Sequence, residues 1–360
     1  MRSWITTATA IIGLSSTLAV AAPAVPRSVN FSPLPLRNGF PNPNQTEVKQ
    51  IQRQAFGTLP NGAVPSNISA EGLNNLRVIA LNELFEVAFF TQLLSNVTHD
   101  VHGYTVKDKD SKDLLVKTLT AVQAQEELHA LNANGALKHF GADPIQPCRY
   151  DFPVSDLDSA LTLAGTFTSV VLGTLQDVIQ IFAQNGDAPL TTGIASVIGQ
   201  EGEQEGWYRL LQGKIPSELP FLTASTRDFA VNALNQTFFV PGSCPNLHTI
   251  KSKTFEPLTL LDTPKAKTES IRFSFTNSTS VPAKDLRLVY INQQNKPIVK
   301  NFKVVKQEEG TVTIEATFPY EENLLNGLTI AVLADAKQSL NSLQNVSDAT
   351  KFGPALIIVN

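Results

Sequence analysis

Apolar residues follow two different spacings along this chain, and the change falls near Lys253. Upstream they return every three or four positions, which indicates amphipathic helices, whereas downstream they alternate with polar residues, which indicates strands. The helical stretches are 69–97, 111–140, 155–185, 189–213 and 227–239. We therefore expect an α+β multidomain chain. A four-helix bundle with a short fifth helix, residues 70–245, should precede a small all-β immunoglobulin-like sandwich of six or seven strands, residues 254–360.

Polar residues interrupt the inward-facing lines of the four long helices. They are Glu83 in the first helix, Glu126 and His129 in the second, Gln176 in the third, and Glu201 with Gln204 in the fourth. Glu86 lies one turn after Glu83, at the edge of the apolar stripe, and is a secondary candidate. The Glu-x-x-His spacing puts both side chains on one helix face, as in the carboxylate-bridged metal sites of helix bundles.

No lysine or arginine lies on these inward lines to neutralise the carboxylates. An ionised carboxylate that is buried without a partner costs several kcal/mol. A bound metal ion, protonated carboxyl groups, an imidazolium at His129 or a polar network with amide hydrogen bonds would each offset that cost. The inward lines alone leave these four explanations open.

Four motifs carry a resemblance to a known family. They are LNELFEVAFF at 81–90, QEELHA at 125–130, LQDV at 175–178 and EGEQEGWYR at 201–209. Through them residues 70–245 resemble the secreted ferritin-like domain family, and more closely its fungal late sexual development and stress-response members of the desiccation type. The resemblance implies a ferritin-like four-helix bundle. In di-iron proteins of that fold the first and third helices each give a glutamate, and the second and fourth each give Glu-x-x-His.

The resemblance implies ligand positions for two metal ions. The positions for one ion are occupied here by residues that can bind a metal, and those for the other include two amides. Glu83 and His129, with bridging Glu126 and Glu201, form the complete set. The second set would need Gln176 and Gln204, and a primary amide is a poor ligand compared with carboxylate or imidazole. We expect either a single divalent ion, iron or manganese, or a metal-free hydrogen-bonded network in which the two amides take part.

The N-terminal sequence predicts export. Residues 1–21 read as a signal peptide that ends in Ala19-Val20-Ala21, and residues 22–69 read as a proline- and asparagine-rich extended arm. Predicted N-glycosylation sites are Asn30, Asn44, Asn67, Asn96, Asn235, Asn277 and Asn345. In an oxidising compartment the two cysteines, Cys148 and Cys244, are expected to form a disulfide, the alternative being two buried thiols. We expect a secreted protein without a transmembrane segment.

The net charge of -4 and the lack of a basic face argue against a nucleic-acid partner. We assign no catalytic residue. The leading interpretation is a secreted, glycosylated protein that is non-catalytic or binds at most one metal ion. The resemblance adds a developmental or stress-related role outside the cell, with the sandwich contacting the cell wall or further copies of the chain. The alternative is a metal-dependent oxidoreductase, either a ferroxidase or a peroxide-consuming enzyme. A two-carboxylate hydrolase ranks last, because a bundle interior offers no cleft for a polysaccharide.

Overall fold

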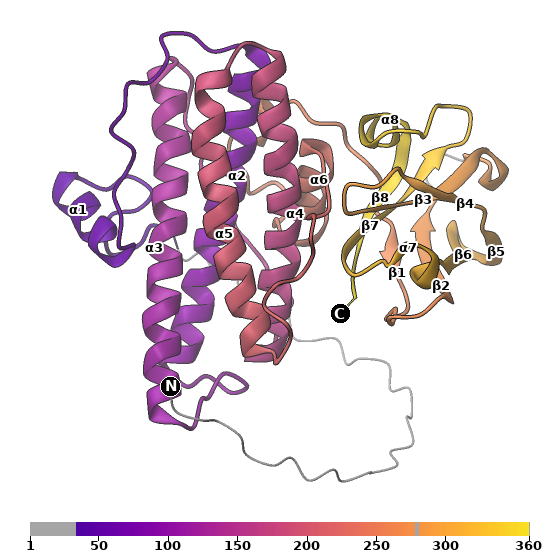
Figure 1. The fold of residues 1–360 in the computed structure, drawn as a ribbon, viewed down its shortest axis with the longest axis horizontal. Coiled ribbons are helices and arrows are strands. Elements are labelled where there is room, and N and C mark those ends of the chain that lie inside the picture. The colour runs from indigo at the N-terminus through magenta and orange to yellow at the C-terminus, as the bar shows by residue number, and fades with distance from the viewer. Residues whose placement is uncertain (1–33, 278–280, 360) are drawn as a thin grey trace.

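The computed structural model describes residues 34–277 and 281–359, so the predicted signal peptide and Asn30 lie outside the described residues. Four long helices form a bundle, and two four-stranded antiparallel sheets follow it (Figure 1). The predicted fold class is therefore confirmed. The helices are α1 (Gln45–Gln54), α2 (Ala70–Thr98), α3 (Lys109–His139), α4 (Leu157–Gln184), α5 (Thr191–Leu211), α6 (Arg227–Thr237), α7 (Tyr320–Asn323) and α8 (Leu343–Ala349).

Short polar side chains fix where three of the bundle helices begin. The hydroxyl of Ser69 accepts from the Gly72 amide at the start of α2. Asp108 and Asp156 accept in the same way from amides in the first turns of α3 and α4. Each such cap satisfies a backbone N–H that the helix itself cannot, which stabilises the helix by about 1 kcal/mol.

Helix α2 is the centre of the bundle. Every residue from Leu81 to Phe90 is buried, because α3, α4 and the chain around Tyr150 cover it on different sides. Phe85 and Phe89 both contact the Phe167 ring of α4 edge to face, with ring centroids 5.1 and 4.9 Å apart. Any polar side chain in this stretch of α2 is therefore removed from water whichever way it points.

From its prolines we expected the N-terminal arm to be extended throughout. The structure differs from this expectation. The arm contains α1, which begins at the capping residue Asn44 and packs on the outer face of α3 (Figure 1). Ile51 is fully buried there, against Ala124 and Leu128. The prolines lie outside the helix, so they bound α1 without interrupting it.

The structure joins Cys148 and Cys244, which are 96 positions apart in the sequence, in a disulfide. The loop that it closes contains α4, α5 and α6. Among the described residues there is no free cysteine. Disulfides of this kind are typical of oxidising compartments.

The sandwich has the strand order of an immunoglobulin-like domain. One sheet runs β1-β2-β6-β5 and the other β4-β3-β7-β8, which correspond to ABED and C′CFG. The strands are β1 (Thr259–Leu260), β2 (Glu269–Thr276), β3 (Leu286–Asn292), β4 (Ile298–Lys300), β5 (Lys303–Glu308), β6 (Thr311–Phe318), β7 (Gly327–Asp335) and β8 (Thr350–Val359). The count exceeds the predicted six or seven because β1 is only two residues long and the apolar run 298–305 is divided into two strands.

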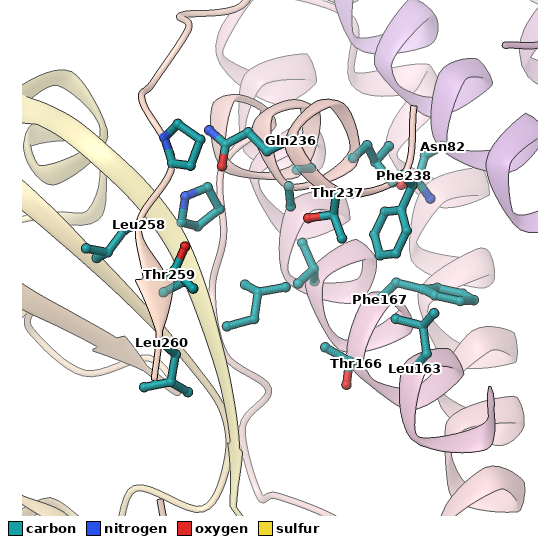
Figure 2. Close-up of a pocket in the computed structure, with 18 residues that line it drawn as sticks. Asn82, Leu163, Thr166, Phe167, Gln236, Thr237, Phe238, Leu258, Thr259 and Leu260 are labelled. Atoms are coloured by element: carbon teal, nitrogen blue, oxygen red, sulfur yellow. The ribbon is translucent and has the colours of Figure 1, made fainter. Parts of the chain in front are cut away.

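The second sheet is buried on both faces, which is why β7 has no polar alternation. Its outer face packs against α4, α6 and α8 through one apolar cluster that includes Val170, Phe229 and Val346. Beside this contact a cavity of about 360 Å³ lies between the bundle and the sandwich. In Figure 2 Leu258 and Leu260 bound this cavity from the strand side, and Leu163 and Thr166 of α4 bound it from the other.

Among the described residues two helices could cross a membrane by length and composition alone, whereas we expected no transmembrane segment. They are α2 and α4, and 78% and 61% of their most apolar windows are buried inside the protein. Both are core helices of the bundle, where a long apolar sequence is ordinary.

Candidate metal centre

Three helices bring four of the predicted ligands together. Glu83 comes from α2, Glu126 and His129 from α3, and Glu201 from α5, and one ligand atom of each lies within 4.8 Å of all the others. The three carboxylates are 0–1% exposed, whereas the His129 side chain is 17% exposed. The cluster therefore lies in the interior, and the imidazole is its most accessible member.

The His129 imidazole lies close to all three carboxylates of the cluster. Its Nδ1 lies 2.9 Å from Glu126 Oε2, 3.4 Å from Glu83 Oε2 and 3.8 Å from Glu201 Oε1. Because an Nδ1–H can point at only one acceptor, the short contact with Glu126 is the hydrogen bond. Glu83 Oε2 and both oxygens of Glu201 are left with no hydrogen-bond partner among the described residues.

The charges of the metal-free cluster follow from this geometry. Burial disfavours the charged form of His129, but the adjacent carboxylates of Glu126 and Glu83 outweigh it and raise the pKa of the imidazole well above its usual range. Burial likewise acts to raise the pKa of Glu126, but the charge and hydrogen bond of His129 outweigh it and lower that pKa. An imidazolium–carboxylate pair therefore forms between the two residues of α3.

The pKa values of the other two carboxyl groups in the cluster are raised, in contrast to that of Glu126. Burial raises the pKa of Glu83 to about 7, and burial together with the charges of Glu83 and Glu126 raises that of Glu201 well above its usual range. One imidazolium cannot neutralise three carboxylates, so without a metal some of them must hold protons. A divalent cation would supply the missing positive charge and occupy the unpartnered oxygens, so the donor set fits such an ion.

Glu86 adds a fourth buried carboxyl group next to the four ligands. It is 2% exposed, and its Oε1 has no hydrogen-bond partner within the described part of the chain. Burial, followed by the charges of Glu201 and Glu126, raises its pKa well above the usual range. Burial beside other carboxyl groups therefore favours the neutral, protonated form of Glu86, and its oxygens do not belong to the cluster of four.

The amide of Gln204 is used in hydrogen bonds. Its Nε2 donates to Glu126 Oε1 at 2.6 Å, and its Oε1 accepts from the Tyr208 hydroxyl at 3.2 Å. Nε2 also lies 3.2 Å from Gln125 Oε1. Gln204 thus orients the Glu126 carboxylate, and Tyr208 orients Gln204.

Gln176 does not face the cluster, so its assignment to an inward line is wrong. It is half-buried on the side of α4 that faces the sandwich, where its Oε1 accepts from Gln294 Nε2 at 2.7 Å. Leu175, one residue earlier, is buried instead and borders the same space as Glu83 and His129. Helix α4 therefore gives an apolar side chain where the ferritin-like pattern has a carboxylate.

Two further buried glutamates were not predicted. Glu127 accepts from Asn38 Nδ2 at 2.7 Å, so it ties α3 to the N-terminal arm. Glu205 accepts from the Ser169 hydroxyl at 2.5 Å, across the contact between α4 and α5. Burial raises the pKa of both carboxyl groups to about 7. In the sequence Glu127 directly follows Glu126, and Glu205 directly follows Gln204. Neighbouring residues of a helix point in different directions, so the spacing pattern places both glutamates off the inward line.

Comparison with known proteins agrees with the geometry of the bundle. Residues 75–214 match the ferritin-like domain family. The matched range begins in α2 and ends just after α5, so the similarity covers the four long helices of the bundle. No curated protein matches the chain.

Some predicted glycosylation sites are better placed than others. Asn44, Asn67 and Asn235 are exposed, and Asn96 is half-buried. The Nδ2 groups of Asn277 and Asn345, where a glycan would attach, donate hydrogen bonds to neighbouring residues. Occupancy of these sites stays a prediction.

Proposed function

We propose that this protein binds one divalent metal ion, iron or manganese, in its ferritin-like domain through Glu83, Glu126, His129 and Glu201. The observation that carries the proposal is the set of unpartnered oxygens of Glu83 and Glu201, buried beside a single imidazole. Mixed carboxylate and imidazole donors suit both metals, and a bound ion would supply redox capacity at this place. Gln204 holds the Glu126 carboxylate in position.

One ion per chain follows from the way the remaining groups are used. The Gln204 amide is occupied by Glu126 and Tyr208, and α4 contributes Leu175 rather than a carboxylate. A second ion would need Glu86 as a further ligand, and burial favours the protonated form of that carboxyl group. Binding the first ion displaces the proton on His129 Nδ1, so affinity should fall at low pH.

Metal analysis of the purified protein tests the proposal. We expect about one equivalent of iron or manganese per chain, because the described residues form one cluster of four ligands. Glu126→Ala should abolish binding, and the exposed Glu203→Gln on the same helix as Glu201 should leave it unchanged. A stoichiometry of two, or no uptake from excess metal, would overturn the proposal.

We further propose that the protein acts outside the cell, as a glycoprotein released by its N-terminal signal peptide. The disulfide and the exposed sequons support this setting. A developmental or stress-related role at a fungal cell surface rests on the resemblance of the sequence motifs. The exposed edge strand β5 is a candidate surface for contact with the cell wall or a second copy. Mass spectrometry of the mature protein from culture medium would test export and glycosylation together.

A metal-dependent oxidoreductase is the second candidate function. It is favoured by the partial exposure of His129, since an external molecule could reach the metal on that side. Oxygen or peroxide consumption with added iron or manganese measures this directly. Turnover no higher than that of Glu83→Ala would eliminate the enzyme and leave metal binding as the function.

A further inference from the structure

A second cavity in the ferritin-like domain ends at the candidate metal centre. Its volume is about 440 Å³, within the range of sites that hold small organic ligands. Glu83 and His129 belong to both the cavity wall and the ligand cluster. The remaining wall comes from α2, α3, α4, the start of α5 and the arm between Pro60 and Pro65.

The wall of this cavity is apolar except for a few polar side chains. Its apolar side chains include Leu76, Ile79, Leu175, Phe182, Ile194 and Val197. Its polar side chains are Glu83 and His129 at one end, with Asn132 and Thr192. No lysine or arginine of the described chain lines it. Such a wall rejects sugars and phosphates, which would lose their hydrogen bonds to water without replacement.

The polar end determines the charge that a ligand can carry. The imidazole there is already paired with Glu126, and no lysine or arginine among the described residues lines the cavity, so an anionic head group would find no free cation in the metal-free protein. Glu83 Oε2 has no hydrogen-bond partner among the described residues and could accept from a hydroxyl. A neutral head group with a donor hydrogen matches this end better than a carboxylate does.

One wall is built from the arm rather than from a helix. The carbonyl of Pro65 accepts from His139 Nε2 at 2.9 Å, which ties this part of the arm to the end of α3. At the other side α1 holds the arm through the buried Ile51. Between these two anchors the exposed Gly62 and Val64 border the cavity, so a ligand could enter by a displacement of this short segment.

We propose that this cavity binds a neutral, largely apolar small molecule of the medium-chain alcohol class, with its hydroxyl group at Glu83 and His129. The position of the hydroxyl beside a metal rests on the proposed function, whereas binding of the apolar chain does not. The site would then combine an ion with an apolar ligand, which sets it apart from a site for iron storage.

Displacement of the fluorescent probe N-phenylnaphthylamine by decanol tests the proposal on the full-length protein. Ala136 is half-buried in α3 and lines the cavity, so Ala136→Trp should fill it and weaken decanol binding by at least about tenfold, or 1.4 kcal/mol. Lys138→Trp, exposed on the same helix, is the matched control and should bind as wild type does. Decanoate should bind more weakly than decanol to the metal-free protein. Equal binding by wild type and Ala136→Trp would overturn the proposal.

Manganese provides a second readout that separates the two proposals. Bound Mn²⁺ should broaden the proton resonances next to the decanol hydroxyl more than those of its terminal methyl group. Decanol binding without metal uptake would refute the metal site and leave the apolar cavity standing. Metal uptake without decanol binding would refute the cavity and leave the metal site standing. Stronger broadening of the methyl group would overturn the assigned orientation.

Discussion

Replacing Glu83 by glutamine should stabilise the metal-free protein and weaken metal binding at the same time. The pKa of Glu83 is raised by burial from 4.5 to about 7. The unfolded chain releases this proton near its ordinary pKa, whereas the folded chain retains it until about pH 7. The penalty on folding is therefore absent below the unfolded pKa, grows as the pH rises, and is complete above the folded pKa.

The size of the effect follows from the difference between the two pKa values. A shift from 4.5 to about 7 corresponds to about 3 kcal/mol at 1.36 kcal/mol per unit. Glutamine carries no charge and cannot incur this penalty, and His129 keeps its hydrogen bond to Glu126. We expect Glu83→Gln to raise the free energy of unfolding by up to about 3 kcal/mol near pH 8, and by little near pH 4.5.

Glu127→Gln is a matched comparison, because burial raises the pKa of Glu127 to about 7 as well, outside the ligand cluster. Asn38 donates to one oxygen of this carboxyl group and Gln123 to the other, and a turned Gln123 amide can pair with the new side chain. Urea unfolding in chelator, followed by circular dichroism near pH 5 and pH 8, should show both variants stabilised only at the higher pH.

Metal titration should then separate the two variants. Glu83→Gln should lose at least about tenfold in manganese affinity, as removal of a ligand predicts, and Glu127→Gln should retain it. Exposed Glu203→Gln should change neither quantity. If Glu83→Gln destabilised the chelated protein at both pH values, the cluster would be a satisfied polar network, and the reasoning from unpartnered carboxylates would be refuted.

Three further predictions concern the rest of the chain. Replacing Cys148 and Cys244 together by serine should lower stability by roughly 4 to 5 kcal/mol on the loop-entropy estimate, measured by calorimetry, and an unchanged transition would contradict a stabilising disulfide. Ile51→Ala should cost about 2 to 5 kcal/mol in the contact between α1 and α3, and proteolysis should then cut the arm faster than in wild type. Asn44→Asp should remove one glycan by mass with stability retained, whereas Asn44→Ala should remove the glycan and about 1 kcal/mol of helix capping; equal stability of the two would argue against the cap.

Two of the helices whose inward residues were predicted correctly, α3 and α5, have mixed composition. Glu126 and Glu201 interrupt otherwise amphipathic patterns, so a spacing of three and four residues fixes which side of each helix faces inward. Helix α4 differs because it is covered by the bundle on one side and by α6 and the sandwich on the other. Apolar residues then occur all around it, and no period distinguishes the line of Gln176 from that of Leu175.

Contacts between distant segments account for the other omissions. Glu127 is buried because α1 and the arm cover the outer face of α3, and a proline-rich sequence gave no sign of that helix. Glu205 is buried by Ser169 of the neighbouring helix. Each of these side chains would be exposed on an isolated amphipathic helix, so only the tertiary structure reveals their burial.

The disulfide between Cys148 and Cys244 also determines how fragments of this protein would behave. A single cut of the backbone anywhere between the two cysteines leaves both pieces covalently attached through the disulfide. Glu201 lies within this segment, between Cys148 and Cys244. Such a nicked molecule would run as one species on a non-reducing gel and separate only after treatment with a thiol. Cleavage in the arm would release a fragment under either condition.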